Sequence, residues 1–283
     1  MPLLHIEHLE DTVLDGNLSA LELLENSSNL TAKIDGKPSI VWGQDTDGLF
    51  FVGTKSVFNK KLIKRCKSYS DIDNWYKGDL HEILTTCFRN LPNDGNIYQG
   101  DFIGFGGDSE YNPNTITYTF DDVIREDVII APHTIYTGNS KDIREWKVSP
   151  IRRNLQNTNN VRFVSSKVTN NNCLEDLTFM INFARTIAGA VEFIEDPKNV
   201  AAMKKELNSY IRTDREIVAE EFENTNLVRF WQYVITIKEQ FMENCNTNRS
   251  EMKASLNGVN IDAEGYVLSD NSQVIKLINR REF

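Results

Sequence analysis

The chain has 283 residues, and its 31 Lys and Arg against 41 Asp and Glu give a formal net charge of −10. This charge excludes a protein that coats nucleic acid by bulk positive charge, although it leaves room for a local basic surface. Because no run of about 18 apolar residues occurs, we expect no transmembrane helix and no membrane partner. The N-terminus lacks a basic n-region and the four cysteines form no Cys-x-x-Cys pair, so we expect a cytoplasmic protein without a signal peptide or a structural zinc site.

The first half of the chain favours strands. A capping-box pattern that begins at Ser19 predicts a short helix through Asn26. Helical periodicity covers residues 71–91. Short apolar and β-branched runs predict strands over residues 30–34, 39–42, 49–54, 97–103 and 128–131. Residues 39–54 form a predicted hairpin around the turn 44–48, and Pro132 stops the last strand, which resumes at residues 135–136.

The second half changes character after about residue 170. Helical patterns cover residues 174–194, 198–211 and roughly 214–245. Strands return over residues 266–268 and 274–278. This order predicts a single α+β domain over residues 1–283 with a helical insertion over roughly residues 170–255.

The sharpest chemical pattern is the tetrapeptide Lys33-Ile-Asp35-Gly36 at the end of a predicted strand. A lysine amine attacks phosphorus only when it is neutral and held in place. Asp35, two residues on, lies on the same side of an extended chain as Lys33. Gly36 permits a sharp backbone turn beside a nucleotide. The bland alternative is a strand end followed by an Asp-Gly turn.

Further motifs follow in order, and with them the chain resembles the nucleotidyltransferase superfamily of ATP-dependent DNA ligases, RNA ligases and mRNA capping enzymes, including phage-encoded members. Lys33-Ile-Asp-Gly36 is similar to motif I of that superfamily, whose lysine accepts the nucleotide. The other similar segments are Gly53-Thr-Lys55-Ser56 (motif Ia), Tyr98-Gln-Gly-Asp101-Phe-Ile103 (motif III), residues 128–136 (motif IIIa), Ala263-Glu264-Gly265-Tyr266-Val267 (motif IV) and Gln273-Val-Ile-Lys276-Leu277 (motif V).

The resemblance implies a role for each matched residue. Lys33 would form a covalent bond to AMP, Lys55 and Lys276 would neutralise phosphate charge, and Asp101 would bind the ribose. Glu264 would face Mg²⁺ or Mn²⁺. Asp35 would orient Lys33 or bind ribose or metal, and His133 would contact nucleotide or be a structural histidine. Six of these residues are expected to converge on one cleft, namely Lys33, Asp35, Lys55, Asp101, Glu264 and Lys276.

The chain also departs from the superfamily pattern. Motif III carries Asp101 where glutamate is usual, Ile278 stands where motif V usually has a second lysine, and Pro38 replaces a frequent arginine. The implied fold is an adenylyltransferase-like, ATP-grasp-like ligase core of two antiparallel β-sheets. Because the sequence ends seven residues after Lys276, we expect no C-terminal OB-fold.

A basic run lies directly after motif Ia. Six cations and no acidic residue occur between positions 55 and 67, namely Lys55, Lys60, Lys61, Lys64, Arg65 and Lys67. Either this run binds polynucleotide phosphates, with Lys60, Lys61, Lys64 and Arg65 as the contacts, or it is a solvated basic loop.

The resemblance therefore implies an ATP-dependent polynucleotide ligase that passes AMP from Lys33 to a 5′-phosphate end of RNA or DNA. Two alternatives stay open. One is a catalytically reduced, nucleotide-binding or structural phage protein with this fold. The other is an adenylyltransferase that acts on an acceptor other than nucleic acid.

Overall fold

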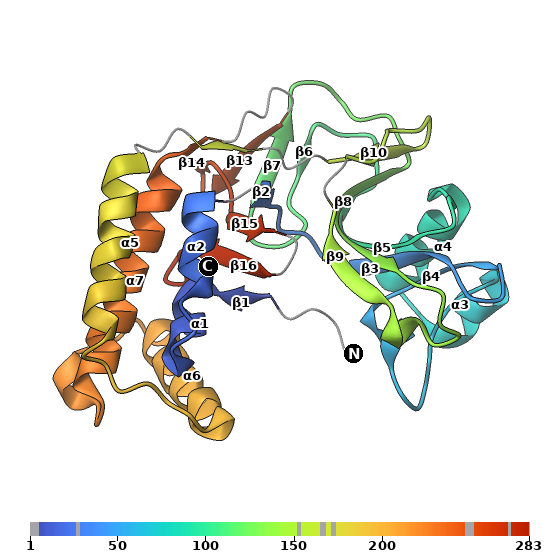
Figure 1. Cartoon of the computed structure of the whole chain (residues 1–283). Helices are drawn as coiled ribbons and strands as arrows, with labels where there is room; N and C mark the ends of the chain where they lie inside the picture. Colours follow the sequence, from blue (N-terminus) through green and yellow to red (C-terminus); the bar gives the residue numbers. More distant parts are fainter. Residues whose placement is uncertain are drawn as a thin grey trace. The chain divides into compact units, whose positions relative to one another are not determined.

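The computed structural model describes residues 6–26, 29–151, 154–164, 168–170, 174–246, 252–270 and 273–282. They form helices and several β-sheets (Figure 1), which confirms the predicted α+β class. No helix among them is long and apolar enough to cross a membrane. The contacts divide the chain into two compact units, each treated by itself. Unit 1 holds the described residues of 34–164 and 252–261, and unit 2 holds those of 6–33, 168–246 and 262–282.

The α-helices of the described residues range from four residues in α1 to 19 in α7. The α-helices are α1 (Leu9–Thr12), α2 (Ser19–Asn26), α3 (Tyr69–Trp75), α4 (Asp79–Asn90), α5 (Leu174–Ala188), α6 (Pro197–Arg212) and α7 (Thr225–Glu243). The 3-10 turns are η1 (Val13–Asp15), η2 (Lys55–Phe58), η3 (Ile143–Glu145) and η4 (Ala219–Glu221).

Unit 1 contains two sheets. The larger has the order β10 (Val161–Phe163), β8 (Val128–Thr137), β5 (Ile97–Gly104), β3 (Ser39–Gln44) and β4 (Phe50–Gly53), with β9 (Lys147–Pro150) also paired to β8. The smaller has the order β14 (Val259–Ile261), β13 (Met252–Leu256), β7 (Thr117–Phe120) and β6 (Glu110–Tyr111).

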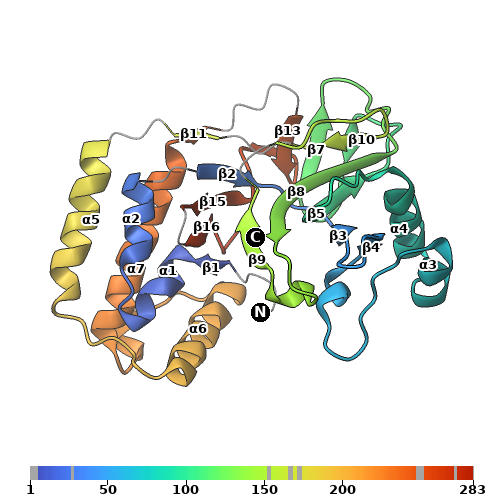
Figure 2. The same ribbon diagram turned by 45° about the vertical axis from the view of Figure 1, so that its right-hand side comes forward.

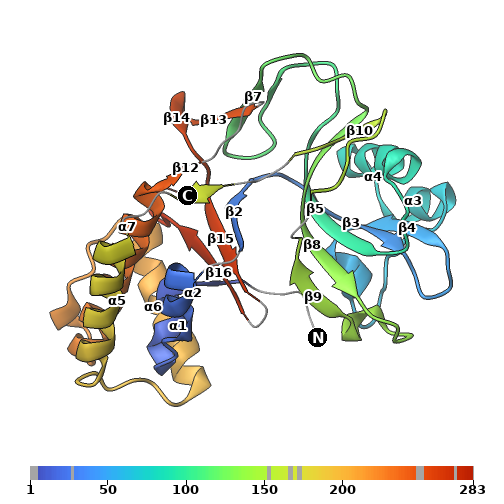
Figure 3. The same cartoon turned by 45° about the horizontal axis from the view of Figure 1, so that its top comes forward.

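Strand β8 shows how unit 1 builds a core on each face of its larger sheet. Successive strand residues point to opposite faces. Val128 and Ile130 belong to the apolar cluster that includes residues of α3 and α4, whereas Ile129 and Ala131 belong to the cluster that includes β7 and β13. Figure 3 shows α3 and α4 beside the β3–β4–β5 part of this sheet.

Unit 2 contains the sheet β1 (Glu7–His8), β16 (Val274–Ile278), β15 (Gly265–Ser269) and β2 (Asn29–Lys33), together with the pair β11 (Thr169–Asn170) and β12 (Cys245–Asn246). One face of the four-stranded sheet packs on helices (Figure 2). The sheet supplies Ala32, Tyr266, Leu268, Ile275 and Leu277 to an apolar cluster with residues of α1, α2, α5 and α7. The helices and the sheet therefore share one core.

A buried group of charges joins the two ends of unit 2. Oε1 of Glu10 accepts hydrogen bonds from Lys238 Nζ at 2.8 Å and from Arg280 Nε at 2.9 Å. Arg280 also donates to both oxygens of Asp11, at 2.8 and 3.1 Å, and Lys238 donates to the Ile278 carbonyl at 2.9 Å. Burial raises the pKa of Glu10, but Lys238 and Arg280 outweigh burial and hold that pKa below its ordinary value of 4.5.

Most predicted elements are confirmed, including helix α2 and the β3–β4 hairpin. The helix predicted over 71–91 is split into α3 and α4, because Gly78 adopts a left-handed φ of +61° between them. Strand β8 passes through Pro132, where the prediction stopped it. Pro132 lies opposite Gly100 beside a register shift, and this irregularity accommodates a residue that has no N–H.

The helical block is shorter than predicted. Helix α5 ends at Ala188, directly before Gly189, rather than at Ile194. The helix predicted from 214 begins at Thr225, where the Asn224 side chain caps it by accepting from the Leu227 N–H. The last helix ends at Glu243, and residues 252–256 form β13 in unit 1.

The described residues form four sheets instead of two antiparallel ones, and β1–β16 and β10–β8 are parallel pairs. Short strands such as β1, β6 and β10 have no alternating pattern of their own that the sequence could reveal.

Replacing Lys238 by Met should lower the free energy of unfolding by about 3–5 kcal/mol, because Glu10 would lose one of its two buried cations. The pKa of Glu10 is lowered in the folded state, so its stabilising contribution is present above pH 4.5 and is lost as pH falls through the folded pKa. In Lys238→Met this acid loss should begin at higher pH. Denaturant unfolding between pH 7 and 3 measures both effects.

Lys205→Met is the matched control, since Lys205 is exposed on α6. It should change stability by no more than about 0.5 kcal/mol. Equal stability of the two variants at neutral pH would contradict the importance of the charge group.

Candidate functional site

The face of the unit 2 sheet opposite its helical core carries the predicted lysines. Ala32 and Leu277 point into the core, so their strand neighbours Lys33 and Lys276 lie on the opposite face. The register pairs Lys33 with Gly265, and Lys276 with Val267, on the intervening strand β15. The two lysines therefore share a face although they come from opposite ends of the sequence.

Lys33 is ion-paired with Glu264 at the end of β2. Its Nζ donates to Oε2 of Glu264, the residue directly before β15. Gly265 lets the strands approach here, because a Cβ at this position would lie 2.1 Å from the Leu277 carbonyl oxygen. The segment that resembles motif IV thus has a local packing reason for its glycine.

Lys276 has an altered acidity. Burial lowers its pKa below the ordinary value of 10.5, and the positive charges of Lys33 and Arg280 lower it further. The carboxylates of Asp11 and Glu7 oppose this shift. The contribution of Lys33 to this pKa shift follows from the placement of the two lysines on one face.

Asp35 and Gly36 belong to unit 1, and the boundary between the units falls directly after Lys33. Oδ2 of Asp35 accepts from Asn114 Nδ2 at 2.9 Å and from the Thr115 N–H at 3.3 Å, and the Asp35 N–H donates to the Tyr118 hydroxyl at 2.7 Å. A Cβ on Gly36 would lie 2.8 Å from the Phe102 carbonyl oxygen. Close packing on β5 therefore also accounts for this glycine.

Asp101 and His133 are neighbours on β5 and β8. Nε2 of His133 lies 3.6 Å from Oδ1 of Asp101, and Nδ1 lies 2.7 Å from the Thr134 hydroxyl. The imidazole thus has a polar neighbour at each nitrogen. The arrangement agrees with either sequence interpretation of His133, as a ligand-contacting or a structural residue.

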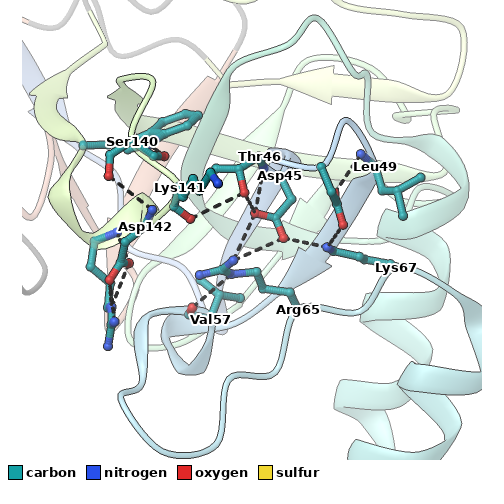
Figure 4. A network of polar contacts seen from close by, with 12 residues as sticks. Asp45, Thr46, Leu49, Val57, Arg65, Lys67, Ser140, Lys141 and Asp142 are labelled. Carbon is teal, nitrogen blue, oxygen red and sulfur yellow. Dashed lines mark hydrogen bonds and ion pairs between the residues drawn. The ribbon is translucent and has the colours of Figure 1, made fainter.

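The basic run divides into two parts, and Figure 4 shows the part in which Arg65 and Lys67 are paired with carboxylates. Nη1 of Arg65 donates to both carboxylate oxygens of Asp45, at 3.0 and 3.1 Å. Nζ of Lys67 contacts Asp45 at 2.7 Å and also pairs with Asp47. Burial raises the pKa of Asp45. The hydrogen bonds from Lys67 and the Thr46 N–H, together with the charge of Arg65, outweigh burial and hold that pKa below its usual range. Arg65, which the sequence predicted as a phosphate contact, thus forms an ion pair within the protein.

Lys55, Lys60 and Lys61 are exposed, and the Lys64 ammonium lies 5.2 Å from the Tyr76 ring centroid. The sequence also predicts that six charged residues converge on one cleft, namely Lys33, Asp35, Lys55, Asp101, Glu264 and Lys276. This convergence stays a prediction. Unit 2 brings together Lys33, Glu264 and Lys276, and unit 1 brings Asp101 beside His133. Asp45 and Asn114 were missed, since a carboxylate in a turn and an amide in a loop carry no distinctive sequence signal.

Glu264 is the carboxylate that lies beside Lys33 at this end of the sheet. No group of three or more His, Cys, Asp or Glu residues suited to a metal occurs in the part of the chain that the structure describes. Mg²⁺ commonly takes one or two carboxylates together with substrate phosphates and water. Glu264 fits that requirement, with the remaining ligands supplied by a bound nucleotide.

Comparison with known families places the chain in a family of unknown function. The model of a family of unknown function (DUF6267) matches residues 4–222 and 178–283, and the chain belongs to that family. No curated protein and no solved structure matches the chain.

Replacing Lys33 by Met should raise the pKa of Lys276 toward 10.5, because a neighbouring positive charge is removed while burial remains. At pH values near 9, wild-type Lys276 should react faster with acetic anhydride than the same residue in Lys33→Met. Competitive labelling between pH 7 and 11, read by peptide mass spectrometry, gives the titration curve.

Lys205→Met serves as the control and should leave the Lys276 curve unchanged, since Lys205 is not among the charges that shift this pKa. Identical Lys276 curves in Lys33→Met and wild type would contradict the coupling.

Proposed function

We propose that this DUF6267 member is an ATP-dependent nucleotidyltransferase that forms a covalent Lys33–AMP intermediate and passes AMP to a 5′-phosphate end of a polynucleotide. The observation that carries the proposal is the Lys33–Glu264 ion pair on the sheet face that also holds Lys276, whose pKa is lowered. A lysine nucleophile needs an adjacent group that takes its proton and a cation that attracts phosphate. These three side chains supply both.

In the proposed reaction, Lys33 Nζ attacks the α-phosphorus of ATP in its neutral form. A P–N bond forms, the bond from the α-phosphorus to the bridging α–β oxygen breaks, and its electron pair leaves with pyrophosphate. Glu264, the ion-pair partner, is positioned to take the proton that the ammonium must release first. The amine's second proton leaves to solvent after attack. Lys276 would neutralise charge on the α-phosphate.

Glu264 would also hold a magnesium or manganese ion that enters with ATP, and this ion supplies charge neutralisation for the phosphates. The roles inferred for Asp35, Gly36, Lys55, Asp101 and His133 stay predictions from the resemblance. In the second half of the reaction, AMP moves to a 5′-phosphate and a 3′-hydroxyl then displaces it. Lys60, Lys61 and Lys64 are the cations proposed to contact polynucleotide phosphates.

An acceptor other than nucleic acid is the second candidate. The net charge of −10 and the neutralisation of Arg65 and Lys67 by Asp45 and Asp47 favour it, because they reduce the attraction for phosphates. Lys33–AMP formation is common to both candidates.

Incubation with ATP and Mg²⁺ should add the mass of one adenylyl group to the protein, at Lys33. The protein is first treated with pyrophosphate to remove any AMP already bound, and intact and peptide mass spectrometry then locate the adduct. Lys33→Arg should abolish it, since a guanidinium stays protonated and cannot attack.

Lys37→Arg is the matched control, four residues away and exposed, and it should retain the adduct. An unmodified wild-type mass with ATP or GTP, in either Mg²⁺ or Mn²⁺, would overturn the proposal.

A further inference from the structure

The segment between η2 and Arg65 in unit 1 exposes two adjacent aliphatic side chains among lysines. Leu62 is 57% exposed and Ile63 is 37% exposed. Lys60 and Lys61 directly before them are exposed, and Lys64 follows. Isolated exposed apolar residues are ordinary on a protein surface. Here the two apolar residues are adjacent and surrounded by cations, in a chain of net charge −10. Such a surface is suited to a partner that is both anionic and apolar.

Residues 59–64 form a loop, and the segments at its base are held on both sides. Val52 and Cys66 exchange backbone hydrogen bonds of 3.0 and 2.9 Å, and Arg65 and Lys67 are clamped by Asp45 (Figure 4). On the other side, the Ser56 hydroxyl lies 2.8 Å from the Tyr76 hydroxyl. The loop tip is therefore presented from a fixed base, and the cations at that base are already neutralised.

We propose that loop 59–64 binds the end or break of a polynucleotide strand, with Lys60, Lys61 and Lys64 on phosphates and Leu62 and Ile63 wedged against the bases. The proposal rests on the proposed function and deepens it by naming the form of the acceptor. Lysines alone would give salt-dependent binding to any duplex. In DNA-bending proteins, in contrast, exposed aliphatic side chains insert between base steps and unstack them.

The wedge implies a preference among nucleic acids. Unstacking costs least where a base is already unpaired or single-stranded. Binding should therefore be tighter for a nicked or single-stranded 5′-phosphorylated oligonucleotide than for an intact duplex. An anionic lipid surface would also suit exposed aliphatic residues among lysines, and flotation with vesicles distinguishes it from nucleic acid.

Fluorescence anisotropy with labelled nicked, single-stranded and intact oligonucleotides, over a series of salt concentrations, separates the two contributions. In Leu62→Ala/Ile63→Ala, affinity for the nicked duplex should fall about tenfold at every salt concentration, with the log–log salt slope unchanged and the preference over intact duplex lost. In Lys60→Ala/Lys61→Ala, the slope should become shallower by about two units, one for each phosphate contact.

Two exposed positions of unit 1 provide matched controls, Val259→Ala for the aliphatic change and Lys253→Ala for the cationic change. Both should bind like wild type. Arg65→Ala should lower stability and leave the salt slope within error, since its charge is already paired with Asp45.

Three results would overturn the loop proposal. The first is wild-type binding by Leu62→Ala/Ile63→Ala. The second is that these changes abolish flotation with phosphatidylserine vesicles and leave nucleic-acid binding intact, which would make the partner a membrane. The third is that wild type binds no oligonucleotide at low salt. If Lys33 adenylylation persists in any of these cases, only the loop proposal falls. If loop-dependent binding occurs without adenylylation, the proposed catalytic function falls and the loop proposal stands.

Discussion

The organisation of unit 2 depends on the buried contact of Glu10 and Asp11 with Lys238 and Arg280. Glu10 and Asp11 come from α1, and their partners, Lys238 on α7 and Arg280 after β16, lie more than 200 positions away in the sequence. Each buried charge is tolerable only while its partners are present. The contact therefore specifies how the first helix, the longest helix and the last strand meet. Lys276 lies four residues before Arg280, so this contact also determines the position of Lys276.

That constraint also explains why the lysines need not lie near each other in sequence. Once β16 and β2 flank β15, alternation of side chains assigns every second residue to the face away from the helices. Lys33 and Lys276 follow from register alone, and Gly265 is required by the close approach to Leu277. The same sheet thus buries apolar residues on one face and presents charged ones on the other. Lys33 and Lys276 take no part in the apolar core on the other face.

Local patterns in the sequence predicted most elements of this architecture, and long-range contacts explain the failures. The capping box at Ser19 and the apolar stripes of the later helices identify their elements, because the information lies within one or two turns. Strands β1 and β10 have two and three residues and exist only through pairing with distant strands. For the candidate site, the motif resemblance pointed to Lys33, Glu264 and Lys276. The partners Asp45 and Asn114 were invisible, since turns and loops become informative only after folding.

The basic run illustrates why a count of charges overstates attraction for phosphate. Six cations lie between residues 55 and 67, but two of them, Arg65 and Lys67, form ion pairs with Asp45 and Asp47. The remaining lysines act against a chain whose net charge is −10, and salt screens them further. Electrostatics alone would then give weak, indiscriminate binding. Any selectivity of this surface must come from contacts that salt does not screen, and Leu62 and Ile63 are the apolar side chains placed among these lysines.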